Sequence, residues 1–282
     1  MNSAQSNKIV CIAGKNNIAC DSLRFLVESS IVPKENIRVI PNSSGYKRIQ
    51  GMKDLIETAR MLGVSVINQL SEIYSLENLY FFSLEYDKIL NPALFRTGEL
   101  FNIHFSKLPA YKGMYTSAWP ILNGEDKTGV TLHKIDRGID TGEIIDQIEF
   151  PIEFADTCRD LYFKYNRFGC ELFKSNICNI LSKQYTARPQ SWYGSSYYSK
   201  ASIDYGCIKI DLNKTAFEIH NQIRAFIFPE YQLPQIHGCS IIGSEILNKA
   251  STFKAGHLVE EKPEFMVIAT IDYDLKLFKK TS

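Results

Sequence analysis

The sequence is organised around residues 101–109, which read Phe101-Asn102-Ile103-His104-Phe105-Ser106-Lys107-Leu108-Pro109. Apolar and polar side chains alternate here, as expected for a β-strand whose successive side chains point to opposite faces. The alternation places Asn102, His104 and Ser106 on one face. Buried strands of α/β proteins are ordinarily apolar on both faces. Three polar groups in succession therefore mark a candidate functional site.

A second polar stretch begins at residue 136 and reads Asp136-Arg137-Gly138-Ile139-Asp140-Thr141-Gly142. Asp140 lies between two glycines, which permit tight turns. A carboxylate in such a turn can be brought back to the strand that carries the amide and the imidazole. We therefore expect Asn102, His104 and Asp140 to meet in space.

The composition is that of an ordinary soluble protein. The chain has 282 residues, and 32 Lys plus Arg against 31 Asp plus Glu give a formal net charge of +1. This balance offers no electrostatic case for a nucleic-acid or membrane-surface partner. No run approaches the roughly 20 apolar residues of a membrane span, and the polar residues 1–5 do not resemble a secretory signal. We expect a cytoplasmic protein.

The cysteines indicate neither a disulfide framework nor a zinc site. They are odd in number, scattered and free of any Cys-x-x-Cys pair. We expect reduced, buried thiols and no metal. The seven are Cys11, Cys20, Cys158, Cys170, Cys178, Cys207 and Cys239.

Strand and helix patterns alternate through the first half of the chain. This alternation predicts an α/β fold with a doubly wound, mostly parallel sheet, in which ligands bind beyond the carboxyl ends of the strands. A polar loop is expected at 41–47. One helix is expected to begin after Gly14, and a second is expected to include Leu55, Ala59 and Leu62. The expected strands are 8–13, 37–40, 64–67 and 79–82.

The second half continues with a short helix that ends at Asn123-Gly124 and with strands at 129–135 and 143–150. Apolar residues at helical spacing then predict a long amphipathic helix over 156–183, capped by Asp156 or Thr157. We assign residues 1–187 to the main domain, 188–200 to a linker and 201–282 to a small β-rich accessory domain. Its expected elements are a helix at 216–226 and strands at 240–242, 265–268 and 275–277.

The two polar stretches together form a specific signature, Asn-x-His-x-Ser-x-Leu-Pro followed by Asp-x-Gly-x-Asp-x-Gly. Through it the chain resembles the formyltransferases that use N10-formyltetrahydrofolate. The resemblance covers residues 79–150 well and the first domain loosely. It implies a Rossmann-like formyltransferase domain, N10-formyltetrahydrofolate as formyl donor and no metal.

By this resemblance, the family's catalytic residues correspond to Asn102, His104 and Asp140. Formyl transfer begins with attack of a neutral amine on the formyl carbon, so one group must accept a proton and another must stabilise an oxyanion. His104 suits the first task, because an imidazole titrates near neutral pH. Asn102 offers an uncharged N–H donor for the second. Asp140 can orient His104 and help to receive the proton.

The resemblance also implies where the pterin ring of the donor lies. Two backbone stretches have amide groups that can match the amide edge of a pterin. They comprise Phe82, Ser83, Leu84 and Glu85 in the first stretch, and Ile135, Asp136, Gly138 and Asp140 in the second.

The loop at 107–120 resembles the sugar N-formyltransferases, which formylate the amino group of a nucleotide-linked deoxyamino sugar. This implies a dTDP-linked acceptor, a role in the synthesis of O-antigen (lipopolysaccharide) or another surface polysaccharide, and a homodimer. The candidate acceptor residues in this loop are Lys107, Tyr111, Lys112, Met114, Tyr115 and Thr116.

A second group of candidate acceptor residues follows the linker. Arg224 could pair with a phosphate, and Phe226, Phe228 or Tyr231 could stack on a base. The alternative is that this aromatic helix end packs between the domains.

Other functions remain open from the sequence. The same chemistry would serve a methionyl-tRNA formyltransferase, and water attack would give a formyltetrahydrofolate hydrolase. A non-catalytic folate- or nucleotide-binding protein is the third alternative. Ser106 either serves the site or hydrogen-bonds the loop backbone. We expect the histidines without a motif to be structural or exposed; these are His133, His220, His237 and His257.

Overall fold

The computed structural model describes residues 7–43 and 48–281. Residues 44–47 of the expected polar loop therefore lie outside the described residues. The chain divides into two compact units, which are described separately. Among the described residues, unit 1 comprises 7–43, 48–113, 129–149 and 164–197, and unit 2 comprises 114–128, 150–163 and 198–281.

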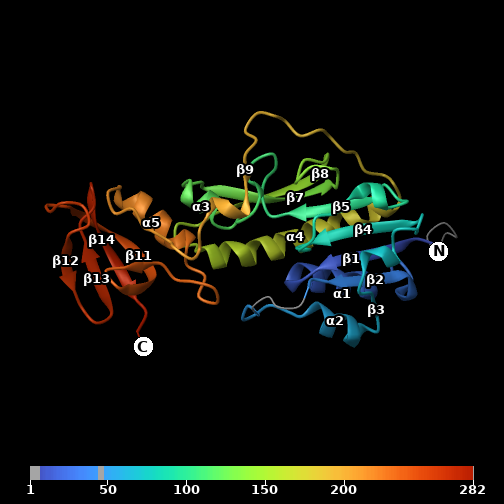
Figure 1. Ribbon diagram of the computed structural model, residues 1–282, viewed down its shortest axis with the longest axis horizontal. Coiled ribbons are helices and arrows are strands. Elements are labelled where there is room, and N and C mark those ends of the chain that lie inside the picture. Colours follow the sequence, from blue (N-terminus) through green and yellow to red (C-terminus); the bar gives the residue numbers. More distant parts are fainter. Residues whose placement is uncertain (1–6, 44–47, 282) are drawn as a thin grey trace. The chain divides into compact units, whose positions relative to one another are not determined.

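Unit 1 contains a seven-stranded sheet with strand order β3-β2-β1-β4-β5-β7-β8 (Figure 1). The first five strands of this order are parallel, and β7 is antiparallel to β5. The doubly wound, mostly parallel sheet is confirmed. The strands are β1 Ile9–Gly14, β2 Ile37–Pro41, β3 Ser65–Val66, β4 Leu79–Leu84, β5 Leu100–His104, β7 Lys127–Lys134 and β8 Ile144–Pro151.

The helices that accompany this sheet are α1 Asn16–Ser29, α2 Leu55–Leu62 and the part of α4 that follows residue 163. α4 packs closely against the start of α1, because a Cβ atom on Gly169 would lie 2.5 Å from Ile18 Cδ1. The Asn166 side chain also accepts a 3.0 Å hydrogen bond from the Ile18 N–H.

The strand that carries the polar face is shorter than the sequence predicted. β5 ends at His104, so Ser106 lies beyond it, while the expected alternation extended through Ser106. The direction of strand winding reverses between β1 and β4, which are neighbours in the sheet. The carboxyl ends of parallel strands at such a reversal are where open α/β sheets bind ligands.

α4 extends over Cys158–Leu181, close to the range predicted from its apolar spacing. Thr157 caps it: Asp160 N–H donates to Thr157 Oγ1, and Thr157 N–H donates to Asp160 Oδ2. Such reciprocal bonds satisfy backbone donors that a helix start leaves without partners. Asp156 instead accepts a hydrogen bond from the Glu153 N–H.

Unit 2 contains α3 Trp119–Leu122, the start of α4, α5 Ala216–Ala225 and a five-stranded sheet of order β10-β11-β14-β13-β12. Its core joins one face of α5 to the sheet through residues such as Ile219, Ile223, Ile241 and Leu275. The expected β-rich segment is thus confirmed, although the sequence did not predict β10 or β12. The strands are β10 Gln235–Ile236, β11 Cys239–Ala250, β12 Leu258–Glu261, β13 Phe265–Ile268 and β14 Tyr273–Lys279.

The compact units do not follow the domain boundaries expected from the sequence. Residues 114–128 and 150–163 belong to unit 2, although both were assigned to the main domain. The functional division into catalytic domain, linker and accessory domain remains a prediction. A further two-stranded sheet pairs β6 Lys112–Gly113 with β9 Tyr197–Tyr198.

Within the described ranges, no helix has both the length and the apolar character needed to span a bilayer. All seven cysteines are free. Four are buried, but Cys178 and Cys207 are exposed and Cys239 is intermediate, so burial was predicted too broadly.

Gly14 allows β1 and β4 to approach each other where the strand order reverses. A Cβ atom at Gly14 would lie 1.8 Å from the backbone oxygen of Leu84. We therefore expect Gly14→Ala to lower the free energy of unfolding by about 2–3 kcal/mol, because the two strands must move apart. Denaturant unfolding measures this change. The control Gly98→Ala has open space around its new methyl group, and an equal loss in both variants would contradict the prediction.

Candidate active site

The candidate site forms at the carboxyl end of β5, where the antiparallel neighbour β7 supplies a second polar row. In the register between them, Asn102 lies opposite His133 and His104 lies opposite Thr131. Directly opposite residues of an antiparallel pair project from the same face. The polar face predicted on one strand is therefore shared by two strands.

Asp140 reaches this face from the turn that follows β7. Its backbone is left-handed, with φ of 54°, which is uncommon for a residue with a side chain. Within the turn, Asp136 Oδ1 accepts hydrogen bonds from the Gly138 N–H at 3.0 Å and the Thr141 hydroxyl at 2.7 Å. A Cβ atom on Gly142 would lie 1.8 Å from Lys134 O. These contacts hold Asp140 in its conformation.

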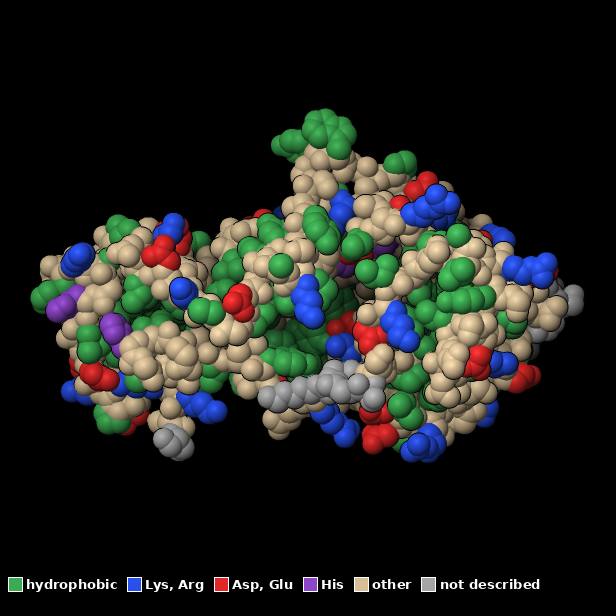
Figure 2. Space-filling model, in the orientation of Figure 1, with side chains coloured by type: hydrophobic (Ala, Val, Ile, Leu, Met, Phe, Trp, Pro, Cys, Tyr) green, Lys and Arg blue, Asp and Glu red, His purple; other side chains and the backbone are tan. Residues whose placement is uncertain are grey.

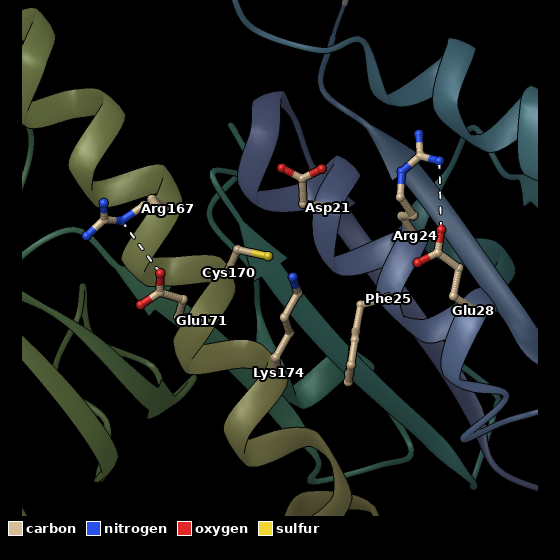
Figure 3. A pocket seen from close by; sticks show the side chains of 8 residues that line it. All are labelled: Asp21, Arg24, Phe25, Glu28, Arg167, Cys170, Glu171 and Lys174. Carbon is tan, nitrogen blue, oxygen red and sulfur yellow. Dashed lines mark ion pairs between the residues drawn. The ribbon is translucent and has the colours of Figure 1, made fainter.

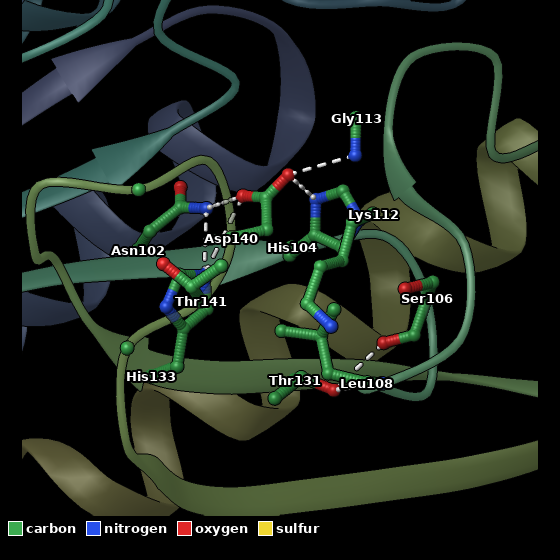
Figure 4. Close-up of polar contacts among 12 residues, drawn as sticks. Asn102, His104, Ser106, Leu108, Lys112, Gly113, Thr131, His133, Asp140 and Thr141 are labelled. Carbon is green, nitrogen blue, oxygen red and sulfur yellow. Dashed lines mark hydrogen bonds and ion pairs between the residues drawn. The ribbon is translucent and has the colours of Figure 1, made fainter. Parts of the chain in front are cut away.

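The three residues predicted from the sequence do come together (Figure 4). Asn102 Nδ2 lies 3.3 Å from Asp140 Oδ1, and His104 Nδ1 lies 3.5 Å from Asp140 Oδ2. The Gly113 N–H donates a 2.9 Å hydrogen bond to the same Asp140 Oδ2. The carboxylate is thus contacted from β5 and from the loop after it.

His133 is a fourth member of this cluster, and the sequence interpretation missed it. Its Nδ1 lies 2.8 Å from Lys134 O, and a carbonyl oxygen only accepts, so Nδ1 carries the hydrogen. In the neutral ring, Nε2 is then an acceptor, and it lies 3.1 Å from Asn102 Nδ2. Asn102 thus lies between two acceptors, His133 and Asp140. Together these two acceptors orient the NH₂ group of Asn102 toward themselves, and each receives one of its hydrogens.

His104 has its hydrogen-bonding direction set by the loop after β5. Its Nε2 lies 2.8 Å from Tyr111 O, so Nε2 carries a hydrogen. Tyr111 has φ of 59°, a left-handed backbone that turns its carbonyl toward the ring. The neutral ring then has its lone pair on Nδ1, which faces Asp140. Protonation of Nδ1 would convert that contact into an ion pair.

Burial raises the pKa of the Asp140 carboxyl, but its surroundings reverse that effect. The nearby His104 and His133 and the hydrogen bond from Gly113 hold the pKa of Asp140 well below its ordinary value of 3.8. These groups stabilise the carboxylate more than desolvation destabilises it. Asp140 is therefore ionised at neutral pH and can stabilise a proton on His104.

The loop after β5 is shaped by hydroxyl and amide groups. Ser106 Oγ donates to Ala110 O at 2.7 Å, so Ser106 supports the loop backbone, one of its two expected uses. Thr131 Oγ1 donates to Ser106 O and accepts from the Leu108 N–H. Gln147 Nε2 bonds both Leu108 O and Thr131 Oγ1 at 2.8 Å. This network fixes the path of the loop from β5 to Gly113.

Lys112 brings a buried ammonium group to the same region. Its Nζ donates to Pro109 O at 3.1 Å and to Ser195 Oγ at 2.7 Å. Burial lowers the pKa of Lys112 below its ordinary value, and the nearby Asp140 carboxylate offsets only part of this effect. The side chain was predicted to contact the acceptor, and in this structure it links the loop to residue 195.

The residues predicted to meet the pterin lie at the end of β4 and in the Asp140 turn. The Phe82 ring is buried against Phe101 and Phe173, so only its backbone is suited to the predicted contact. Two carbonyls in this region are already bonded: Leu84 O accepts from the Lys15 N–H, and Glu85 O from Asn42 Nδ2. Ser83 is also buried. Pterin contact at these positions remains a prediction.

The predicted acceptor residues divide between the two units. Lys107 in unit 1 forms an ion pair with Glu149. In unit 2, Met114 and Tyr231 are exposed, whereas Thr116, Phe226 and Phe228 are buried. The Tyr115 ring packs edge-on against Tyr205, with centroids 4.8 Å apart.

The guanidinium of Arg224 is occupied within unit 2. It donates to Asn221 Oδ1 at 2.9 Å and to the carbonyls of Glu153 and Asp156 at 3.2 and 3.0 Å. Only 5% of Arg224 is exposed. These contacts agree with the alternative named in the sequence analysis, in which this helix end packs inside the protein. Phosphate binding by Arg224 remains a prediction.

The remaining histidines without a motif lie in unit 2. His220 is buried, lies 2.8 Å from Ser244 Oγ and 3.0 Å from Phe154 O, and stacks on the Phe154 ring. His237 and His257 are exposed. The prediction that they are structural or exposed agrees with these positions.

A separate polar pocket lies between α1 and α4 within unit 1 (Figure 3). Ion pairs Arg24–Glu28 and Arg167–Glu171 flank it. Its six charged side chains sum to zero, and none belongs to the cluster around Asp140. The lining residues are Asp21, Arg24, Phe25, Glu28, Arg167, Cys170, Glu171 and Lys174.

Three neighbours of Asp140 were not assigned by the sequence interpretation, namely His133, Gln190 and Gly113. Thr131 and His133 alternate with Val130 and Leu132, so the polar alternation seen at residues 102–106 was also present on β7. Only the register of β7 against β5 shows which residue it faces. Gln190 donates to Asp140 O, and its place in a predicted linker gave no such indication.

The described part of the chain contains no group of three or more His, Cys, Asp or Glu side chains arranged to hold a metal ion. The cluster consists of one amide, two imidazoles and one carboxylate. Such groups can donate a hydrogen bond, accept a proton and stabilise the resulting charge.

Comparison with known proteins identifies the family. Residues 73–177 match a family model described as formyl transferase. The N-formyltransferase from Helicobacter canadensis, solved in complex with folinic acid and dTDP-3-aminofucose, shares 45% identity and a TM-score of 0.90 over 97% of this chain and 100% of that one. WlaRD, a sugar 3N-formyl transferase solved in the presence of dTDP and 5-N-formyl-THF, shares 45% identity and a TM-score of 0.91 over 98% and 99%.

Compared with these two structures, the curated relatives are covered by this chain over a smaller part of their own length. The methionyl-tRNA formyltransferase of Alkaliphilus oremlandii is 31% identical over 212 residues, which are 72% of this chain and 66% of that protein. The bifunctional polymyxin resistance protein ArnA of Wigglesworthia glossinidia brevipalpis is 36% identical over 58% of this chain, but only 25% of its own length is covered. The chain belongs to the formyltransferase family, and the predicted resemblance is confirmed.

The lowered pKa of Asp140 predicts how the stability of the protein depends on pH. A carboxyl with a depressed folded-state pKa stabilises the fold above its ordinary value and loses that contribution as pH falls toward the folded value. We expect the stability advantage of wild type over Asp140→Asn to be smaller at pH 3 than at pH 7 by on the order of 1 kcal/mol. Urea unfolding at both pH values measures it.

Asp126→Asn is the control for this experiment, because the Asp126 side chain is exposed. The exposed Asp126 has none of the Asp140 contacts, so its difference from wild type should change less between pH 7 and pH 3 than that of Asp140→Asn. An Asp140→Asn difference that stayed constant from pH 7 to pH 3 would show that the pKa of Asp140 is not depressed.

Proposed function

We propose that this protein is a sugar N-formyltransferase, which moves the formyl group of N10-formyltetrahydrofolate to the amino group of a dTDP-linked deoxyamino sugar. The observation that carries this proposal is the cluster of Asn102, His104 and Asp140 in a chain that matches two sugar formyltransferases along almost its full length. Identity of 45% with both supports the same class of acceptor.

The chemistry of the cluster fits this donor. N10-formyltetrahydrofolate supplies an electrophilic formyl carbon: the acceptor nitrogen forms the new C–N bond, and the bond to N10 breaks as N10 gains a proton. Asn102 has an uncharged amide that can stabilise negative charge on the formyl oxygen. The ionised Asp140 faces His104, with Asp140 Oδ2 3.5 Å from His104 Nδ1. The pair of His104 and Asp140 would take the proton lost by the amine.

Asn102 must break a contact to act as the oxyanion donor. Both hydrogens of its Nδ2 are used, by His133 Nε2 and Asp140 Oδ1. The bond to Asp140 is the longer, at 3.3 Å against 3.1 Å. We propose that this hydrogen turns to the formyl oxygen when the donor is present, while His133 retains the other and keeps the amide oriented.

Methionyl-tRNA is the alternative acceptor with the same chemistry. The curated methionyl-tRNA enzymes support it by identity, although they match over a smaller share of their length than the sugar enzymes do. Binding tRNA through its phosphates requires a concentrated basic face. The net charge is +1, and on the face seen in Figure 2 blue and red side chains are interspersed without a continuous basic patch. These features favour the sugar acceptor.

Two further hypotheses are a formyltetrahydrofolate hydrolase and a non-catalytic binding protein. A hydrolase would transfer the formyl group to water, and free formate would then form without an acceptor. A non-catalytic binding protein has no need for an ionised carboxylate held against two imidazoles. A homodimer, a cytoplasmic location and a role in O-antigen or lipopolysaccharide synthesis complete the proposal.

The acceptor is tested directly with purified protein and N10-formyltetrahydrofolate. We expect one member of a panel of dTDP-, UDP- and GDP-linked amino sugars to gain the mass of one formyl group, with dTDP sugars favoured. Charged initiator tRNA is the competing acceptor in the same assay. Formylation of the tRNA alone, or formate release alone, would overturn the sugar acceptor.

His104 should carry most of the proton-transfer effect. We expect His104→Ala to lower kcat by about 100-fold or more, because general-base catalysis typically contributes that much. Steady-state kinetics measure the loss, and a thermal melt shows whether the fold is retained. His257→Ala is the control, since His257 is exposed in unit 2. Turnover of His104→Ala close to wild type would refute the assigned role.

A further inference from the structure

Residues 188–200 were predicted to be a linker, but in unit 1 the part from Arg188 to Ser196 is hydrogen-bonded to each loop of the candidate site. At its start, Arg188 and Ile144 exchange backbone hydrogen bonds of 2.8 and 2.9 Å. At its end, Ser196 O accepts from the Lys112 N–H at 2.9 Å, and Ser196 Oγ accepts from the Tyr111 N–H at 2.8 Å. The segment is therefore anchored on both sides of the site.

Gln190 lies between these anchors and bonds the turn that carries Asp140. Its Nε2 donates two hydrogen bonds of 2.8 Å, one to Asp140 O and one to Gly142 O. A side-chain amide has two N–H groups, so both are spent on this turn. Gly142 is buried, and its carbonyl would otherwise lose a hydrogen bond in a place that water does not readily reach.

The turn is confined on two sides. On one side, Gly142 packs so tightly that a Cβ atom there would lie 1.8 Å from Lys134 O. On the other side is Gln190. Asp140 itself has φ of 54°, a conformation that persists only where surrounding contacts impose it. The Gln190 amide supplies such a contact directly to the Asp140 backbone.

The side-chain oxygen of Gln190 does not take part in these hydrogen bonds. Gln190 Oε1 is a buried side-chain atom without a hydrogen-bond partner in the part of the chain that the structure describes. An unsatisfied buried acceptor is unfavourable for folding. The hydrogen bonds of the Gln190 side chain therefore all go to the Asp140 turn, through its two N–H donors.

We propose that Gln190 is a positioning residue for Asp140, and that the segment from Gln190 to Ser196 sets the distance between the two site loops. Gln190 holds the Asp140 turn, and Ser195 and Ser196 hold the loop of Tyr111 to Gly113. Those two loops meet at the 2.9 Å bond from the Gly113 N–H to Asp140 Oδ2. Gln190 acts through the backbone of Asp140 and does not touch the reacting atoms.

The kinetic test compares Gln190→Ala and Gln190→Glu with the control Gln184→Ala, an exposed glutamine before the segment. This test rests on the proposed formyl transfer. We expect both Gln190 variants to lower kcat by about 10-fold or more with KM for donor and acceptor within about threefold, because small displacements of reacting groups are costly. The glutamate is similar in shape but brings no N–H donors, so it should not rescue the loss.

A double-mutant cycle shows whether the effect passes through Asp140. In an Asp140→Asn background, Gln190→Ala should have little further effect on kcat, because the residues then act as one unit. An equal fold-change in both backgrounds would overturn the proposal, as would wild-type kcat in both Gln190 variants.

A measurement without substrate keeps the proposal testable if no acceptor is found or if a variant is poorly stable. Amide hydrogen exchange at Gly113 reports the bond to Asp140 Oδ2 directly. We expect faster exchange at Gly113 in Gln190→Ala and Gln190→Glu, with amides of the β1 core unchanged. Wild-type exchange at Gly113 in both would refute positioning by Gln190, whereas failure of formyl transfer in wild type alone would refute only the proposed function.

Discussion

The ionised carboxylate of Asp140 is the interaction on which the rest of the site depends. It accepts a hydrogen bond from Gly113 and faces His104, His133 and Asn102. Burying a charge is unfavourable unless other groups compensate it. Here the compensating groups come from β5, β7 and the loop after β5. A single buried charge thus links β5 and its following loop with β7, more than 20 residues further along the chain.

The fold provides for this charge in two ways. The sheet places β5 and β7 side by side in antiparallel register, so their polar residues project from the same face. The turn after β7 is tight enough to return a carboxylate to that face, because Asp136 bonds the turn internally and Gly142 allows close contact with Lys134. The glycines predicted to allow a tight turn therefore have a specific steric role.

The same arrangement explains why the amide of Asn102 points as it does. A carboxylate oxygen only accepts, so the NH₂ side of the Asn102 amide faces Asp140 Oδ1 at 3.3 Å, and His133 Nε2 lies 3.1 Å from the same nitrogen. Asp140 and His133 together fix the orientation of Asn102, in the way that partners of a functional side chain commonly fix its geometry. Charge, tautomer and amide orientation in this site are parts of one hydrogen-bond network.

Local pattern in the sequence determined the order and type of most elements, the polar face of β5 and the turn of Asp140, because alternation and glycine placement act over a few residues. The paired motif then identified the family and the three central residues. The roles of His133 and Gln190 could not be read this way, since one depends on strand register and the other on contacts of a predicted linker 50 positions after Asp140. Only the tertiary structure decides which distant residues satisfy a buried charge and a left-handed backbone. Those requirements are met by whatever the fold brings near, and sequence spacing does not encode that proximity.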